Sequence, residues 1–273
     1  YAFVSLHIGD MENQETLENF EETVAIYEHL FRAEPAALAC DLHPDYLASR
    51  YAHRRSRDEG LPLLSVQHHH AHVASCMADN DWDPDAGPVL GVVFDGSGYG
   101  TDGSIWGGEF LIADYRGFRR YGHLQALPLP GGEAAIHRPY RTALAWLQAS
   151  LGEIPDLAFL RSISKEEVGV VCRMAARGTN TPLTSSCGRL FDAVSALLDV
   201  CGRSTYDGHA AVRLEMLAGD VSGSRRNTPR YPFCIERKGG GNVVRLDPLL
   251  KAIVEDLKAG RGPREISAVF HTT

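Results

Sequence analysis

Several features are missing from this sequence. It has no apolar run of the roughly 18 residues needed to cross a bilayer. Its first residues, Tyr1-Ala-Phe-Val-Ser-Leu-His-Ile-Gly-Asp10, lack the charged region that opens a signal peptide. A membrane-spanning or secreted protein is therefore not expected. A starting methionine is also missing, so we expect the chain to be a fragment excised from a longer protein.

Long basic runs are absent as well. The formal charge is −8, and basic residues form pairs such as Arg54-Arg55 and Arg225-Arg226 rather than longer clusters. Because non-specific nucleic-acid binding relies on a concentrated positive charge, this balance argues against a nucleic-acid partner.

No Cys-x-x-Cys pair occurs, which removes the commonest cysteine metal motif. The six cysteines are widely spaced along 273 residues, at positions 40, 76, 172, 187, 201 and 234. A disulfide framework is not expected at this length, and reduced thiols in a cytosolic protein are the better interpretation. Nothing in the sequence indicates an activated thiol at Cys187, so we expect this residue to serve packing.

The composition, a turn-forming stretch and the order of the expected elements predict a two-lobed α/β protein. Hydrophobic content of 44% and charged content of 23% are ordinary for a soluble globular protein. The polar, turn-forming stretch Asn80-Asp-Trp-Asp-Pro-Asp-Ala-Gly87 suggests a boundary between lobes at 1–84 and 85–273. Each lobe has strands followed by helices, which fits two α/β lobes with a cleft between them.

Periodicity and turn residues locate the individual elements. Strands are expected at 2–8, 37–40, 63–66, 89–94, 104–113, 119–124, 231–236 and 242–246. Helices are expected from Asn13 to Phe31, at 46–57, from the histidines onward, and at 133–151, 166–176, 189–200, 209–217, 247–259 and 264–271. The strands at 89–94, 104–113 and 119–124 should form a meander.

Four histidines fall within five residues in Val66-Gln-His-His-His-Ala-His-Val73, in a protein with only 12. In a helix, His68 and His72 project from one face, one turn apart, and form a two-ligand metal clamp. His69 and His70 should point elsewhere. A zinc protease is excluded, because its general-base Glu directly follows the first histidine and His69 stands there instead. A hydrogen-bonded histidine cluster without metal is the alternative.

Two histidines leave a metal under-coordinated, so a carboxylate must come from elsewhere. Asp95, at the end of a predicted strand, is the first candidate. Imidazole plus carboxylate suits iron, zinc or manganese alike.

Asp95 also opens the glycine-rich segment Asp95-Gly-Ser-Gly-Tyr-Gly-Thr-Asp-Gly103. The segment matches neither the Rossmann nor the Walker pattern. Glycines at a strand turn let backbone amides approach phosphate oxygens, as in the actin-like and sugar-kinase-like ATPases. A plain hairpin turn is the alternative. The nucleotide-binding candidates are Gly96, Ser97, Gly98 and Gly100.

Two further turns of small residues lead into predicted helices, Gly131-Gly-Glu-Ala-Ala135 and Ser185-Ser-Cys-Gly-Arg-Leu-Phe-Asp-Ala193. Helix N-termini favour anions, although each turn could be only a cap. The candidates here are Gly131, Gly132, Glu133, Ser186, Gly188, Arg189 and Asp192.

In combination, these motifs resemble the HypF family of hydrogenase-maturation carbamoyltransferases. The matching runs cover essentially the whole chain: Ser5-Leu-His-Ile-Gly-Asp-Met-Glu-Asn13, Cys40-Asp-Leu-His-Pro-Asp-Tyr46, Val66-Gln-His-His-His-Ala-His72, Asp95-Gly-Ser-Gly-Tyr-Gly-Thr-Asp-Gly103, Trp106-Gly-Gly-Glu109, Ser186-Cys-Gly-Arg-Leu-Phe-Asp-Ala193, Thr205-Tyr-Asp-Gly208 and Ile266-Ser-Ala-Val-Phe-His271. The part matched is the carbamoyl-transfer domain. It is similar to the universal tRNA threonylcarbamoyl-transfer proteins and has the actin/sugar-kinase/Hsp70-like (ASKHA) two-lobed fold, which would be incomplete here.

The resemblance implies a cytoplasmic enzyme that receives carbamoyl-adenylate, made from carbamoyl phosphate and ATP by another domain of the same polypeptide. The carbamoyl group would pass to the C-terminal cysteine of a partner, HypE, as a step toward the cyanide ligands of nickel–iron hydrogenase. The family binds a divalent metal, iron or zinc, through residues matching His68, His72 and Asp95, and through a later aspartate. Magnesium would accompany ATP.

Departures from the family are also expected. The N-terminal domains and the opening hairpin of the first lobe are absent, and the chain stops at Thr273, before the late aspartate ligand. Ser97 replaces a common Thr, and His209 a common Gln. These truncations argue against full activity in the isolated fragment. The alternatives are an O-carbamoyltransferase acting on a small-molecule hydroxyl, and a non-catalytic module that binds metal, nucleotide or HypE.

Overall fold

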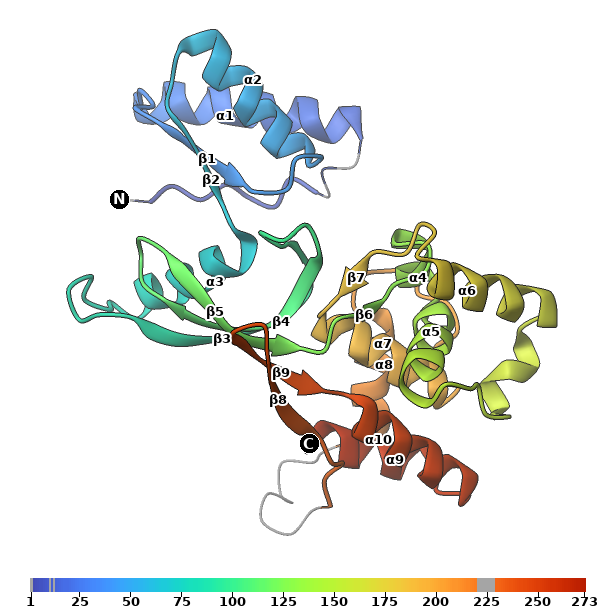
Figure 1. The fold of residues 1–273 in the computed structure, drawn as a ribbon. Coiled ribbons are helices and arrows are strands. Elements are labelled where there is room, and N and C mark those ends of the chain that lie inside the picture. Colours follow the sequence, from blue (N-terminus) through green and yellow to red (C-terminus); the bar gives the residue numbers. More distant parts are fainter. Residues whose placement is uncertain (1, 10, 12, 220–228) are drawn as a thin grey trace. The chain divides into compact units, whose positions relative to one another are not determined.

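Figure 1 shows the computed structural model, which describes residues 2–9, 11, 13–219 and 229–273. The chain divides into two compact units, residues 1–71 and residues 72–273, and each is described by itself. The lobe boundary after residue 84 stays a prediction. In the described part of the chain, no helix is both long and apolar enough to cross a membrane.

The first unit joins two parallel strands through a helix. Its elements are α1 (Gln14–Phe31), β1 (Leu38–Asp41), α2 (Leu47–Glu59) and β2 (Leu63–Val66). Leu38 lies opposite Leu63 and Asp41 opposite Val66, so both strands end at the same edge. The connection through α2 is what a parallel pair requires.

The start of the first unit differs in one respect from expectation. As predicted, Asn13 caps α1, with its side chain accepting a hydrogen bond from the Thr16 amide at 2.8 Å. The strand expected at 2–8 is wrong. A strand needs a ladder partner, and among the residues of this unit that the structure describes, only β1 and β2 pair in a sheet. Val4 and Leu6 are accordingly exposed.

The second unit is built on a mixed sheet. Its strands are β3 (Val89–Tyr99), β4 (Ile105–Ala113), β5 (Phe118–Leu124), β6 (Leu127–Pro128), β7 (Leu183–Thr184), β8 (Cys234–Lys238) and β9 (Gly241–Arg245). The order is β6-β7-β4-β5-β9-β8, and β3 pairs with β4. The meander of β3, β4 and β5 is confirmed. β3 runs on through the glycine-rich segment, with a register shift between Phe94 and Gly98.

The remaining helices follow β2 along the chain. They are α3 (His68–Asp79), α4 (Glu133–His137), α5 (Pro139–Leu151), the 3-10 helix η1 (Ala158–Ser162), α6 (Lys165–Arg177), α7 (Cys187–Leu197), α8 (His209–Ala218), α9 (Asp247–Lys258) and α10 (Pro263–His271). The single helix expected at 133–151 is wrong. Pro139 has no N–H for a helical bond, so the chain ends α4 and starts α5 there.

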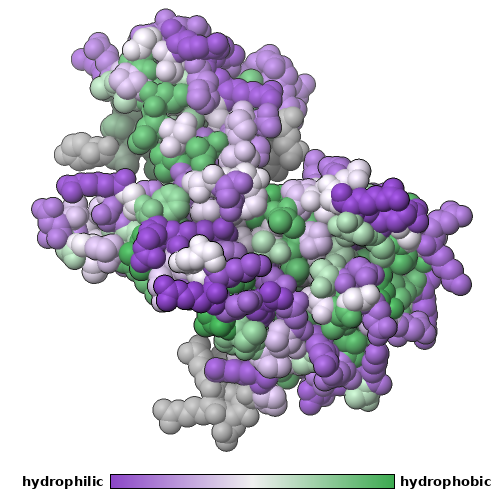
Figure 2. Space-filling view, viewed as in Figure 1, coloured by the Kyte–Doolittle hydropathy of each residue, from purple (hydrophilic) through white to green (hydrophobic). Residues whose placement is uncertain are grey.

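A large apolar cluster lies between the helices of the second unit. Its largest fully buried aliphatic side chains are Leu144, Leu147, Leu197, Leu214, Leu250, Ile253 and Ile266. A smaller cluster joins α3 to β3 and β4 through Val73, Met77, Val93, Trp106 and Leu111. Figure 2 shows hydrophilic side chains over much of one face, with apolar side chains reaching the surface between them.

Candidate functional site

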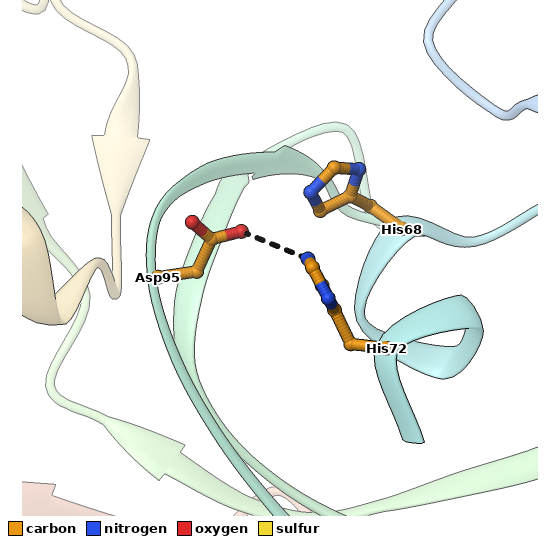
Figure 3. Close-up of side chains that lie close together, drawn as sticks. All are labelled: His68, His72 and Asp95. Carbon is orange, nitrogen blue, oxygen red and sulfur yellow. Dashed lines mark ion pairs between the residues drawn. The ribbon is translucent and has the colours of Figure 1, made fainter. Parts of the chain in front are cut away.

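Helix α3 and strand β3 bring two imidazoles and a carboxylate together. His68 and His72 lie one turn apart on α3, and Asp95 of β3 points toward them (Figure 3). The His72 Nε2 and Asp95 Oδ2 atoms are 3.8 Å apart. One candidate ligand atom from each of the three residues lies within 4.8 Å of the others. Because α3 is continuous, helix geometry sets the spacing of the two imidazoles.

This arrangement fits a divalent metal. Two ligand atoms bound about 2.1 Å from one ion are separated by about 3 to 4 Å, close to the distance between His72 and Asp95. Two imidazoles and a carboxylate form the donor set preferred by zinc and iron. His68 and Asp95 are half-buried and His72 is exposed, so the cluster leaves room for further ligands.

The other two histidines of the run do not belong to this cluster. The His69 imidazole is fully buried, with Nδ1 3.0 Å from Nε2 of Gln67. The backbone amide of His70 donates to Oε1 of Gln67 at 2.9 Å, and the His70 side chain is also buried. Neither belongs to the metal-type group, as the helix spacing indicated.

The backbone around Asp95 is held by the turn before α7. The Ser186 hydroxyl lies 3.0 Å from the carbonyl oxygen of Asp95 and 2.7 Å from that of Gly96. A Cβ at Gly107 would stand 2.6 Å from the Asp95 carbonyl, and one at Gly188 would stand 2.9 Å from the Gly96 Cα. Both glycines are therefore required for β3, β4 and α7 to approach so closely.

A buried ion pair follows this turn. Arg189 Nε lies 3.1 Å from Asp192 Oδ2, and both side chains are 5% exposed. Burial raises the pKa of Asp192 to about 6, opposed by the positive charge of Arg189. The Arg189 Nη1 atom has no hydrogen-bond partner within the described ranges. Its guanidinium reaches within 3.8 Å of the point where a Gly96 Cβ would lie, so it can serve an anion beside the glycine-rich strand.

The remaining glycine-strand candidates lie further along the hairpin. Gly98 pairs with Trp106, and a Cβ at Gly100 would meet the Trp106 indole nitrogen at 2.2 Å. Ser97 is exposed. Among these four candidates, Gly96 is the one that the structure places directly beside Arg189 and the Ser186 turn.

The turn at residues 131–133 is not brought to this cluster. β6 and β7 are antiparallel with Leu127 opposite Thr184, so the chain after β6 runs back toward the start of β7. The Gly131 amide donates to the Asn180 carbonyl, and Gly132 and Glu133 follow there. Ser186 lies beyond the other end of β7. A nucleotide role for Gly131, Gly132 and Glu133 stays a prediction.

One further group was missed in the sequence. Arg120 of β5 donates to Glu109 Oε2 at 2.7 Å and lies 3.9 Å over the Trp106 ring. Glu109 is fully buried and also accepts the Ser185 hydroxyl at 2.5 Å. The signal was Glu109 itself, since a carboxylate in a buried strand needs a cationic partner. Arg120 also reaches Asp102. Burial alone would raise the pKa of Asp102, but hydrogen bonds from Ser104 and Trp106 outweigh it, so the pKa lies below its usual value.

Cys187, at the start of α7, lies within the apolar cluster. Burial raises the pKa of its thiol to about 11. A thiol that stays protonated at neutral pH is a poor nucleophile, which agrees with the packing role expected from the sequence.

Comparison with known protein families gives consistent matches along the chain. The family described as "HypF Kae1-like domain" matches residues 1–79. The family described as "Carbamoyltransferase, Kae1-like Domain, second subdomain" matches residues 91–273. Carbamoyltransferase HypF of Rhodobacter capsulatus is 40% identical over 100% of this chain and 35% of that protein. The probable carbamoyltransferase HypF of Methanocaldococcus jannaschii is 34% identical over 98% of this chain and 34% of that protein.

Solved structures agree. The crystal structure of a full-length HypF in the phosphate- and nucleotide-bound form superposes with a TM-score of 0.89 at 38% identity, covering 100% of this chain and 41% of that one. The structure of T. kodakarensis HypF gives 0.80 at 33% identity, over 95% of this chain and 34% of that one. The chain thus spans about a third of the length of the Rhodobacter capsulatus and Methanocaldococcus jannaschii relatives.

Proposed function

Because this chain belongs to the HypF carbamoyltransferase family, we propose that it forms the carbamoyl-transfer domain of a HypF-type protein. Its reaction would move the carbamoyl group from carbamoyl-adenylate to the C-terminal cysteine of HypE, in the cytoplasm, during synthesis of the cyanide ligands of nickel–iron hydrogenase. The mixed α/β structure would be an ASKHA fold. The observation that carries the proposal is the cluster of His68, His72 and Asp95 at the glycine-rich strand. It lies in a chain that this family matches along most of its length.

His68, His72 and Asp95 would hold the metal, which we take to be iron or zinc. When bound, the ion would act as a Lewis acid toward the oxygens of the carbamoyl-adenylate. His72 stands at the exposed side of the cluster, so substrate oxygens would approach from there.

Gly96, Gly188 and Arg189 would receive the adenylate. The two glycines bring their backbones together without side chains, and the buried Arg189 guanidinium lies against Gly96. A desolvated arginine stabilises a phosphate more strongly than one in water. The phosphate- and nucleotide-bound form of a related HypF supports an anion site in this family. ATP, with magnesium, would be consumed by a separate adenylate-forming domain of the same polypeptide.

The transfer step would be a nucleophilic acyl substitution at the carbamoyl carbon. The cysteine sulfur of HypE attacks the carbamoyl carbon and forms a C–S bond, while the C–O bond to the phosphate breaks. The bonding electrons leave with AMP, and the thiol proton is released. Arg189 would offset the negative charge that grows on the departing phosphate.

The test is to supply the chain with carbamoyl-adenylate, a divalent metal and HypE, and to follow the intact mass of HypE. We expect a single carbamoyl adduct on the C-terminal cysteine, and none on HypE whose last cysteine is replaced by serine. Labelling of an aminosugar hydroxyl instead of HypE would favour the O-carbamoyltransferase. Absence of any transfer, with no nucleotide binding by calorimetry, would favour a non-catalytic module.

The metal site has its own test. The double variant His68→Ala/His72→Ala should lose its bound metal by elemental analysis while its circular dichroism stays that of the wild type. His53→Ala, an exposed histidine on α2, is the matched control. Full metal occupancy in the double variant would contradict the assigned ligands.

A further inference from the structure

The parallel strands of the first unit bring an aspartate against one of the metal-site histidines. Asp41 is the last residue of β1 and lies opposite Val66, the last residue of β2. Two residues later in the chain, His68 opens α3. Because parallel strands end at one edge, residues 27 apart in sequence meet there. His68 Nδ1 and Asp41 Oδ2 are 2.7 Å apart.

The Asp41 carboxylate is held in place by groups other than His68. Its second oxygen, Oδ1, accepts the backbone amide of His43 at 2.8 Å. The backbone carbonyl of Asp41 accepts the hydroxyl of the buried Ser49 at 3.1 Å. The next residue, Leu42, donates its amide to the Val66 carbonyl at 2.9 Å. These contacts fix the orientation of the carboxylate independently of the imidazole.

An ionised carboxylate only accepts hydrogen bonds, so the imidazole nitrogen facing it carries the proton. The proton of a neutral His68 then lies on Nδ1, and the lone pair lies on Nε2. A histidine that ligates a metal through one nitrogen needs its proton on the other. The contact with Asp41 therefore prepares His68 as an Nε2 donor.

We propose that Asp41 is a positioning residue for the metal site, which fixes the tautomer and the ring orientation of His68. The inference rests on the proposed function, since it concerns the same metal. It assigns a role to the first Asp of Cys40-Asp-Leu-His-Pro-Asp-Tyr46 that differs from the role of the second. Asp45 forms an exposed ion pair with Arg50 at 2.7 Å.

The first measurement is made on the metal-free chain, by ¹⁵N NMR of the histidine side chains at a pH where the imidazoles are neutral. His68 is assigned by the signals lost in His68→Ala. We expect Nδ1 of His68 to be protonated in the wild type, and this preference to disappear in Asp41→Ala. A wild-type His68 protonated on Nε2 would overturn the proposal.

The second measurement is the affinity for Co²⁺ or Zn²⁺, by chelator competition and the visible spectrum of bound Co²⁺. Removing an outer-shell carboxylate typically weakens metal binding about 10- to 100-fold, and we expect that loss in Asp41→Ala. Asp41→Asn, which keeps an acceptor oxygen, should lose less. Asp45→Ala, in the same loop, should bind as the wild type does. Asp41→Ala should cause no further loss in a His68→Ala background.

The outcomes separate the two ideas. If the wild type binds metal and His68→Ala weakens binding, but Asp41→Ala does not, the positioning role is overturned and the proposed metal site stands. If the wild type binds no divalent metal, the metal site itself fails, and the role of Asp41 with it. If Asp41→Ala does not fold, as judged by circular dichroism, the tautomer of His68 in the wild type still tests the proposal.

Discussion

The two units of this chain are stabilised by different means. In the described part of residues 1–71, Leu17 and Ala52 are the apolar side chains that are buried, whereas residues 72–273 enclose a large apolar cluster. The first unit relies more on charged contacts, such as the two hydrogen bonds from Arg55 to Glu28 at 2.7 and 3.1 Å. Apolar burial is worth more than part-exposed ion pairs, so we expect the second unit to be the more stable.

The largest expected difference comes from truncating one leucine in each unit. Leu250 is fully buried, and Leu250→Ala should lower the free energy of unfolding of the second unit by about 3–5 kcal/mol through lost burial and a residual cavity. Leu17→Ala, at a site that is 9% exposed, should cost about 2 kcal/mol, in the first unit only. Denaturant unfolding followed by circular dichroism measures both. Equal losses would erase the contrast between the units.

A buried ion pair should be worth more than a part-exposed one. Glu109→Gln leaves the Arg120 guanidinium facing a neutral amide and should cost about 3–4 kcal/mol. Glu28→Gln removes the charge opposite Arg55, where the Glu28 side chain is 28% exposed, and should cost about 1 kcal/mol. Chemical denaturation at low and high salt gives both values. A larger loss in Glu28→Gln would reverse the proposed order.

Asp192 makes the second unit sensitive to pH. Its pKa is raised to about 6 in the folded protein, so the folded state holds the proton more tightly than the unfolded state. The stability from the neutral acid is present below about pH 4 and is lost as pH rises through about 6, a change of up to about 2–3 kcal/mol. Asp192→Asn should remove this fall, as measured by denaturant unfolding between pH 4 and 7. Parallel pH curves for the two proteins would contradict it.

The smallest expected effect is one that both units share. Asn13 caps α1 and Ser164 caps α6, each accepting a backbone amide three residues on. Replacing either by alanine should cost about 1 kcal/mol, because the bond is local and does not depend on the surrounding core. Thermal unfolding of Asn13→Ala and Ser164→Ala tests this. A much larger loss at one cap would show that its helix also depends on contacts beyond the cap.

Much of the fold followed from local sequence signals. Periodicity and caps predicted the strands of the meander and most helices, because those signals act within a few residues. The break at Pro139 was missed although the proline itself marks it. The two-residue strands β6 and β7 were missed because their pairing joins residues such as Leu127 and Thr184, which no local pattern connects.

The candidate site was predictable where one element carries it. Helix spacing placed His68 and His72 on one face, and the strand end suggested Asp95. Contacts made across the fold were not accessible in this way. Glu109 in a buried strand called for a cation, but nothing local identified Arg120 as that cation. Nothing local indicated that Asp41 reaches His68 from a strand 27 residues earlier. The glycine turns looked equivalent in sequence, yet only the one before α7 meets Asp95.

The close approach at Gly107 and Gly188 limits how this site can change over evolution. A metal ligand can be exchanged for another donor, as histidine and cysteine or aspartate and glutamate replace one another in metal proteins. No residue is smaller than glycine, and a single methyl group at Gly107 would stand 2.6 Å from the Asp95 carbonyl. Selection can therefore retune the metal chemistry more easily than it can alter the two positions that contribute no donor atom at all.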